Sequence, residues 1–351
     1  MTAWAPLDGG SPPASGRCAR RAAPSPRAAA ARAVLALGFL ALFTGAGHAL
    51  RKRACDLDTA TAYRLDPELR GRSEAADPAP ACAPRRAPGG GRAAVVTYIR
   101  DDRHFELLQQ LECTLRRSNP GLELAAMAVG GELAPGTLAA MRALNVTLLP
   151  VAPLDVPNVY EPRFARNWLK LRAWELAAYD SVLLVDSDVA FAGDVSGLVP
   201  APAPFAAAYD QPGRLNLAKT AGRPMFQGGA LLLRPCAAAA AHMRALVAAR
   251  PKLRFARSNA EQAFLSWYFR HSAWVLPLEY NAMTRPSLAG DATVGGAAPR
   301  VVHFTSNKPF GGPRRGSPGH QFLCPLEELD ARLGALAPPR APARPLWRSS
   351  A

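Results

Sequence analysis

The amino-acid sequence predicts an α/β fold with a parallel sheet and helices on both of its faces. Strand and helix signals alternate from residue 92 onward, and one of the strand signals is an uninterrupted apolar run. The composition, with 49% hydrophobic and 20% charged residues, excludes a wholly disordered, collagen-like or small disulfide-stapled protein. We therefore expect one folded domain over residues 92–330 of the 351-residue chain.

The segment before this domain has the composition of a targeting and spacer region. Residues 1–32, rich in alanine, proline, serine and arginine, predict a disordered cytosolic tail. Residues 33–50 carry no charge and are long enough for a transmembrane helix, and the arginines before them favour a cytosolic N terminus. We expect a type II signal anchor, with a cleaved signal peptide or an organelle transit peptide as alternatives. Residues 51–91 then predict a flexible stem, and residues 331–351 a second disordered tail.

The charge balance is strongly basic, with 42 lysine and arginine against 27 aspartate and glutamate residues and a net charge of +15. Such a balance raises nucleic acid as a partner. The basic residues are spread between alanines and prolines, however, and do not alternate with aromatic residues that could stack on bases. We therefore expect no nucleic-acid partner.

The six cysteines define neither a metal site nor a disulfide framework. Cys18 falls in the predicted cytosolic tail, which leaves an odd number for the rest of the chain, and no C-x-x-C pair occurs. The sequence predicts no zinc site and leaves the disulfide pairing open.

The folded region opens with two strand–helix pairs and a third strand. Residues 95–99 form a short β-branched and aromatic run, and apolar residues at helical spacing follow until Asn-Pro-Gly at 119–121 ends them. Residues 122–129 and 146–151 predict two further strands, separated by a helix over 137–144. This order predicts parallel pairing, with helices on both faces of the sheet.

The next helix and strand lead to two carboxylates. Residues 164–179 place apolar side chains on one helical face and run into strand 181–185, whose continuous apolar character fits burial on both sides. Asp186-Ser187-Asp188 follows directly, at the strand end where open α/β sheets bind ligands. Two carboxylates at this spacing can share a divalent cation with diphosphate oxygens, although a simple polar turn would show the same pattern.

Glycine-rich phosphate loops do not follow any predicted strand. Neither G-x-G-x-x-G nor G-x-x-x-x-G-K occurs in the sequence. A dinucleotide-binding or P-loop site is therefore disfavoured.

The residues around the carboxylate pair resemble glycosyltransferase family 8, the glycogenin-like retaining enzymes of the GT-A fold. The resemblance covers about residues 93–325. It implies one Rossmann-like nucleotide-diphospho-sugar transferase domain, with a mixed, mainly parallel central sheet, behind the membrane anchor. Its blocks follow the family's order: a lysine-bearing helix, strand and metal motif (167–188), the next strand (207–210), a Phe-Asn-Ser-Gly-like strand (226–233), an Asp-Gln-like helix (261–265), a Tyr-Asn turn (278–281) and a closing His…Lys-Pro block (301–310).

The resemblance implies that Asp186, Asp188 and His303 bind a divalent ion, with manganese the best match to two carboxylates and one imidazole. Without the family context, a lone histidine after a strand would be read as structural. Ser187 completes the metal motif. Thr97 and Tyr98 would approach the nucleotide's base and ribose. The lysines expected to neutralise donor charge are Lys170 and Lys308, and the residues expected to hold the sugar or to lie in the catalytic region are Asp210, Gln227, Gly229, Glu261 and Gln262.

The implied reaction is retaining transfer of a hexosyl or pentosyl group from a UDP-sugar to a glycan, protein or lipid acceptor in the Golgi lumen. Departures from the family pattern leave the sugar open: Glu261 stands for Asp, Gln227-Gly228 for Asn-Ser, Ser306 for Gly and Phe310 for Trp. Two other classes stay open. One is a non-catalytic lumenal nucleotide-sugar-binding protein, and the other a metal-dependent nucleotidyltransferase, which would carry a glycine-rich loop after its first strand.

Overall fold

The computed structural model describes residues 91–156, 162–201, 203–210, 225–249, 260–269, 272–284, 298–305, 308–310 and 319–334, all within one compact unit. The predicted cytosolic tail, membrane anchor, nearly all of the stem and the end of the C-terminal tail lie outside these residues. Within the described ranges, none of the helices combines the length and the apolar character that crossing a bilayer requires.

The centre of the fold is a seven-stranded sheet in the order β3-β2-β1-β4-β7-β6-β8. β1 pairs in parallel with β2 and β4, β2 with β3, and β6 with β8, while β7 runs antiparallel between β4 and β6. The predicted mixed, mainly parallel sheet is confirmed. The strands are β1 (Ala93–Tyr98), β2 (Glu123–Val129), β3 (Thr147–Val151), β4 (Ser181–Val185), β6 (Phe205–Tyr209), β7 (Phe226–Leu233) and β8 (Trp274–Val275).

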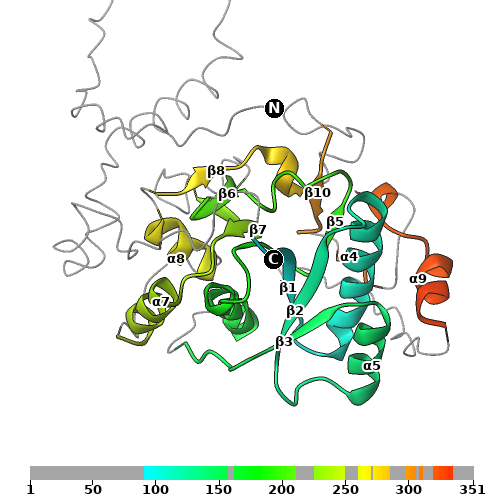
Figure 1. Cartoon of the computed structure of the whole chain (residues 1–351), viewed down its shortest axis with the longest axis horizontal. Helices are drawn as coiled ribbons and strands as arrows, with labels where there is room; N and C mark the ends of the chain where they lie inside the picture. Colours follow the sequence, from blue (N-terminus) through cyan, green and yellow to red (C-terminus); the bar gives the residue numbers. More distant parts are fainter. Residues whose placement is uncertain are drawn as a thin grey trace, which may run out of the picture. The chain divides into compact units, whose positions relative to one another are not determined.

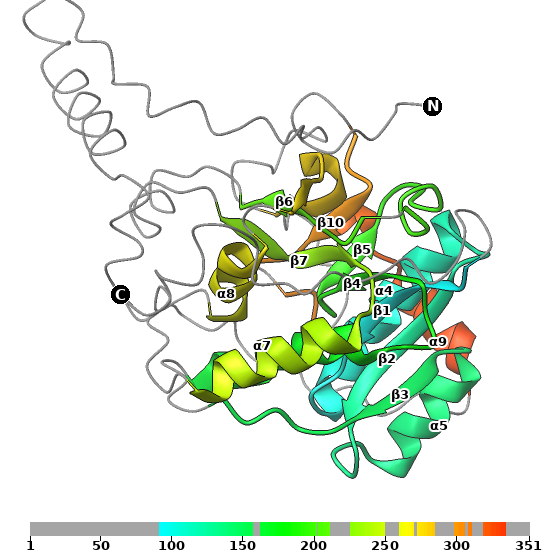
Figure 2. The same ribbon diagram turned by 60° about the vertical axis from the view of Figure 1, so that its left-hand side comes forward.

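Helices cover both faces of this sheet (Figures 1 and 2). On one face lie α4 (Phe105–Ser118) and α5 (Pro135–Ala143); on the other lie α7 (Ala237–Ala249), α8 (Ala260–Tyr268) and the 3-10 helix η2 (Pro162–Glu175). Side chains alternate along each strand, so successive residues of β1 and β4 enter two different hydrophobic cores. This two-sided burial explains why β4 is apolar throughout.

One predicted helix differs in type and in length. Residues 164–179 were expected to form one helix, whereas η2 is a 3-10 helix that ends at Glu175. Tyr179 lies beyond the helix and is buried in the core, where its hydroxyl donates to Glu123 Oε1, 2.7 Å away on β2. This bond fixes the chain at the entry to β4.

A second, three-stranded sheet brings distant parts of the chain together. β5 (Val189–Phe191) pairs antiparallel with β10 (Val301–His303), which pairs in parallel with β9 (Ala282–Met283). The 3-10 helix η3 (Leu278–Asn281) leads directly into β9. In this register His303 lies opposite Val189, one residue after the Asp-Ser-Asp turn.

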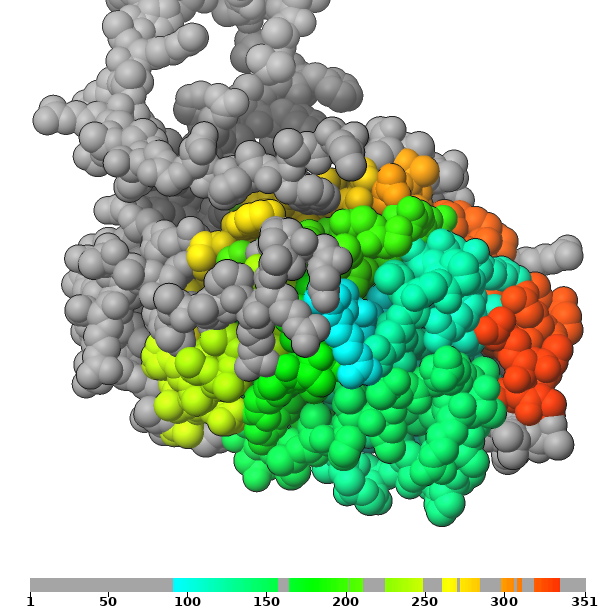
Figure 3. All heavy atoms as spheres, viewed as in Figure 1, coloured from blue at the N-terminus to red at the C-terminus, as the bar shows by residue number. Residues whose placement is uncertain are grey.

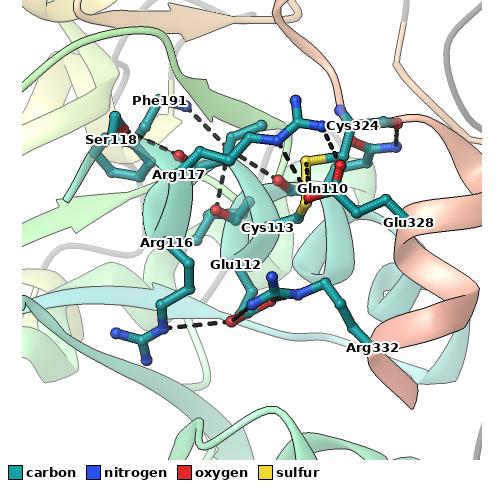
Figure 4. Close-up of a disulfide and its surroundings, with 12 residues drawn as sticks. Gln110, Glu112, Cys113, Arg116, Arg117, Ser118, Phe191, Cys324, Glu328 and Arg332 are labelled. Atoms are coloured by element: carbon teal, nitrogen blue, oxygen red, sulfur yellow. Dashed lines mark hydrogen bonds and ion pairs between the residues drawn. A yellow bond between two sulfur atoms is a disulfide. The ribbon is translucent and has the colours of Figure 1, made fainter. Parts of the chain in front are cut away.

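A disulfide joins the folded region's two ends. Cys113 of α4 is bonded to Cys324, which precedes α9 (Leu326–Leu333), across a sequence separation of 211 residues. Gln110 donates to the Cys324 carbonyl and accepts from its N–H (Figure 4). The space-filling view shows α9, in red, against the teal surface that includes α4 (Figure 3). The structure thus answers the pairing question for these two cysteines, and α9 continues three residues past the predicted domain end at 330.

Candidate functional site

The two carboxylates lie where the central sheet passes into the second sheet. β4 ends at Val185, and Asp186 and Asp188 follow in a turn before β5 begins. The Asp186 N–H donates to the Gly229 carbonyl of β7 at 3.0 Å, which fixes the turn against the antiparallel neighbour of β4. The Asp186 side chain is 17% exposed and that of Asp188 is 6% exposed. Both carboxylates are therefore largely shielded from water.

His303 completes a three-residue cluster with these carboxylates. Its Nε2 lies 3.5 Å from Asp188 Oδ1 and 3.7 Å from Asp186 Oδ2. The Phe304 N–H donates to the Asp188 carbonyl, so the backbone holds the histidine and the turn together. One ligand atom from each residue lies within 4.8 Å of the others, as a shared metal ion requires. The sheet pairing of β5 with β10 brings these residues together from more than a hundred positions apart.

The protonation states in the cluster suit a cation. Burial lowers the pKa of His303 to about 4, so the imidazole is neutral at physiological pH. Burial opposes ionisation of Asp186, but the positive charges of Lys170 and, to a smaller extent, Lys308 outweigh it and hold the Asp186 pKa below its ordinary value. Ionised carboxylates and a neutral imidazole are the forms that bind metal. The residues present therefore fit a divalent cation such as manganese.

Lys170 lies behind the cluster rather than in solvent. The side chain is 1% exposed, and its Nζ lies 2.7 Å from Asp186 Oδ1, 2.9 Å from Glu261 Oε1 and 2.9 Å from the Gly228 carbonyl oxygen. Burial alone would lower its pKa, but Asp186 and Glu261 raise it above the ordinary value. Because these acceptors engage the ammonium, Lys170 neutralises two protein carboxylates and positions Asp186.

Helix α8 contributes Glu261 and Gln262, which are linked to Gly228 of β7 through Lys170 and by a direct hydrogen bond, respectively. Glu261 is buried and pairs with Lys170, while Gln262 Oε1 accepts from the Gly228 N–H at 2.9 Å. The Gly228 carbonyl accepts from Lys170. These bonds tie α8, η2 and β7 into one unit beside the carboxylates.

Gln227 and Gly229 flank this glycine and lie against His303. Gln227 Oε1 accepts from the Gly229 N–H and, at 2.6 Å, from Asn281 Nδ2. A Cβ atom at Gly229 would lie only 2.0 Å from His303 Nδ1, so any side chain there would displace the imidazole. Glycine is therefore needed for close approach of β7 to the histidine.

The remaining predicted residues have different positions. Thr97 is fully buried, and its hydroxyl has no hydrogen-bond partner in the described part of the chain. Tyr98 is buried with its ring 5.7 Å from Lys170 Nζ, and its hydroxyl donates to Asn167 Oδ1 at 3.2 Å. Lys308 contacts the Asp188 carboxylate from a half-exposed position. Ser187 is buried in the turn between Asp186 and Asp188. The charge of Asp210 partly offsets the lowering of the His303 pKa by burial.

The sequence names two further residues of this site only as parts of motifs and assigns them no specific role. Asn281 is buried against Gln227, and only its place in the Tyr-Asn turn indicated a role. Phe310 lies under the Arg103 guanidinium at 4.4 Å, with the His104 ring 6.0 Å away. Arg103 lies more than two hundred residues before Phe310, and no local sequence pattern predicts their contact.

Comparison with known proteins identifies the fold. No protein-family model and no curated protein sequence matches the chain. The structure of the galactosyltransferase LgtC in complex with donor and acceptor sugar analogues is similar, with a TM-score of 0.51 and 17% identity over 69% of this chain and 96% of LgtC. The bifunctional glycosyltransferase WbbM is similar with a TM-score of 0.52 and 15% identity, over 71% of this chain and 51% of WbbM. The chain therefore has the GT-A fold of glycosyltransferases.

Proposed function

We propose that the protein is a metal-dependent retaining glycosyltransferase of family 8, which transfers a hexosyl or pentosyl group from a UDP-sugar to a glycan, protein or lipid acceptor. The observation that carries the proposal is the cluster of Asp186, Asp188 and His303 at the carboxyl end of β4 in a GT-A fold. The order of the family-8-like motifs supports the choice of family.

The residues of the cluster have separable roles in this reaction. Asp186, Asp188 and His303 would hold the divalent cation, whose Lewis acidity stabilises the charge on a departing diphosphate. Lys170 keeps Asp186 ionised inside the protein. Lys308, already at the Asp188 carboxylate, would pair with diphosphate oxygens. Resemblance to retaining enzymes implies that the acceptor hydroxyl attacks the face that the diphosphate leaves.

The location proposed for this activity is the Golgi lumen, with the chain anchored as a type II membrane protein through residues 33–50. The disulfide between Cys113 and Cys324 supports this location, because such bonds persist in oxidising compartments. Insertion of residues 33–50 can be tested by carbonate washing of membranes, after which the full chain is expected in the pellet.

The test is release of UDP from a panel of UDP-sugars by the full chain, with manganese and with chelator. We expect manganese-dependent release from one donor, abolished in Asp186→Asn and Asp188→Asn. Asp155→Asn removes an exposed carboxylate outside the cluster and serves as the matched control. Unchanged release in the two cluster variants would refute the metal assignment.

Two other outcomes would identify the alternative classes. Manganese-dependent UDP binding without release from any donor would indicate a non-catalytic nucleotide-sugar-binding protein. Pyrophosphate release from a nucleoside triphosphate and a sugar phosphate would indicate a nucleotidyltransferase.

A further inference from the structure

A buried pair of amides lies beside the metal cluster. Gln227 of β7 is 8% exposed and Asn281, at the end of η3, is 1% exposed. Asn281 Nδ2 donates to Gln227 Oε1 at 2.6 Å, and the same oxygen accepts from the Gly229 N–H. Two donors thus converge on one carbonyl oxygen in the interior.

These two hydrogen bonds determine the orientation of both side-chain amides. The Gly229 N–H can only donate, so the Gln227 atom that faces it must be the oxygen. That oxygen can only accept, so the Asn281 atom that faces it must be the NH2 group. The opposite orientation of Asn281 would place two carbonyl oxygens against each other. The Gln227 NH2 group is therefore the part of that side chain left to meet a ligand.

In this orientation the side-chain carbonyl of Asn281 makes no hydrogen bond within the described part of the chain. The carbonyl oxygen, Asn281 Oδ1, is buried. An unpaired buried carbonyl is unfavourable, and native proteins rarely keep one without a compensating contact. The compensating contact here is the bond that holds Gln227.

The amide pair also lies close to His303, one of the three residues of the cluster. The Cβ position at Gly229 is 2.0 Å from His303 Nδ1 and 2.7 Å from Gln227 Oε1, so the histidine and the glutamine contact the same small volume. Ala282, the residue after Asn281, pairs with Val302 of β10. A diphospho-sugar whose phosphates meet the cation at His303 would bring its sugar close to Gln227.

We propose that Asn281 is a positioning residue that holds Gln227 with its NH2 group toward the donor sugar, where it donates to a hydroxyl oxygen. The proposal rests on the proposed function and deepens it, because it assigns Gln227 the role of donor and not acceptor. Asn281 acts through Gln227 and does not itself touch the sugar.

The test separates the sugar from the nucleotide. For each variant of the full chain, titration calorimetry in manganese gives two dissociation constants, one for UDP and one for the UDP-sugar that supports release. The ratio of the UDP constant to the UDP-sugar constant measures how much the sugar adds to the affinity. Asn281→Asp keeps the shape of the side chain but replaces the NH2 donor with an acceptor that repels Gln227 Oε1, so Gln227 loses the bond that holds it. We expect the ratio to fall by about tenfold in Asn281→Asp, Asn281→Ala and Gln227→Ala.

The double variant distinguishes positioning from a general loss of structure. If Asn281 acts only through Gln227, the combination of Asn281→Ala with Gln227→Ala lowers the ratio no further than Gln227→Ala alone. Gln321→Glu, at an exposed amide, controls for the added negative charge of Asn281→Asp. Should Asn281→Ala fail to fold, Asn281→Ser and the isosteric Asn281→Asp carry the comparison, with thermal midpoints recorded for all variants.

Three results would overturn the proposal. They are an unchanged ratio in Asn281→Asp, an equal loss of affinity for UDP and UDP-sugar, and additive effects in the double variant. A wild-type protein that binds no UDP in manganese would refute the proposed function itself, and this inference with it. The first three results leave the proposed function intact, so the two failures are distinguishable.

Discussion

The Lys170 ammonium lies 2.7 Å from Asp186 Oδ1, at a position where the lysine side chain is 1% exposed. A second carboxylate, that of Glu261, lies 2.9 Å away on the other side. The buried ammonium of Lys170 thus forms ion pairs with two carboxylates. Removal of the lysine would take away the nearest positive charge from both carboxylates in a medium that solvates charge poorly.

Lys170→Met is expected to lower the free energy of unfolding by about 3–5 kcal/mol, as for other buried ion pairs that lose one partner. Urea denaturation at pH 7 measures the change, and Arg142→Met, at an exposed residue, is the matched control. Addition of Glu261→Gln should recover part of the loss, because it removes one of the two unpaired charges. A Lys170→Met protein as stable as the wild type would show that the pair is not important for folding.

Gly229→Ala is expected to weaken manganese binding by at least about tenfold, because the added Cβ would occupy the place of the His303 ring. Calorimetric titration with manganese measures this loss. Gly121→Ala, at a glycine with no atom within 4 Å of the Cβ position, should bind manganese like the wild type. Equal affinities in the two variants would contradict the assignment of His303 as a ligand.

The sheet order and the position of the two carboxylates follow largely from local sequence signals. The apolar run of β4 and the two carboxylates after it place Asp186 and Asp188 at the correct edge of the sheet. The alternation of strands and helices over the first part of the domain predicts the parallel order of β1 to β4. These features depend on periodicity within short segments, which a single sequence contains.

Other features depend on contacts between distant segments. His303 reaches Asp188 only through the pairing of β5 with β10, and no local pattern encodes that register. Lys170 would be read as a solvated helical lysine, because its burial is created by Glu261 of α8 and Gly228 of β7. Asn281 is a single amide in a turn and has no signal of its own. The sequence alone could therefore name these residues only through a family resemblance.

Lys308→Met is expected to change two affinities in opposite directions. Its ammonium contacts the Asp188 carboxylate and so competes with a metal ion for that ligand. Loss of this half-exposed pair should raise manganese affinity in the absence of nucleotide by up to about fivefold. Affinity for UDP in saturating manganese should fall, since one cation facing the diphosphate is gone. A decrease in both affinities would show that Lys308 does not compete for Asp188.

Stability should depend on the protonation of His303 between pH 6.5 and about 4. Its folded pKa of about 4 lies below the ordinary value of 6.5, so the unfolded chain binds more protons in this window. The free energy of unfolding should therefore fall as the pH is lowered, by up to about 3 kcal/mol from this residue. Denaturation of the wild type and of His303→Gln at pH 7 and pH 4.5 isolates the contribution. Parallel losses in both proteins would assign the pH dependence to other groups.

The disulfide between Cys113 and Cys324 holds both ends of the folded region, and its removal should be costly. A bond that closes a loop of this length restricts the unfolded chain strongly, so Cys113→Ser combined with Cys324→Ser should lower the free energy of unfolding by about 2–5 kcal/mol. The disulfide also fixes the backbone at Cys324, on the C-terminal side of Lys308, where Gln110 of α4 donates to the Cys324 carbonyl and accepts from its N–H.

We therefore expect the double serine variant to lose UDP affinity in manganese as well as stability, and to lose more of both than a variant at a surface contact such as Arg166→Ala. Peptide mapping of the wild type without reductant should recover residues 113 and 324 in one cross-linked species. Recovery of both as free thiols from protein made in an oxidising compartment would contradict the bond and remove this support for a lumenal location.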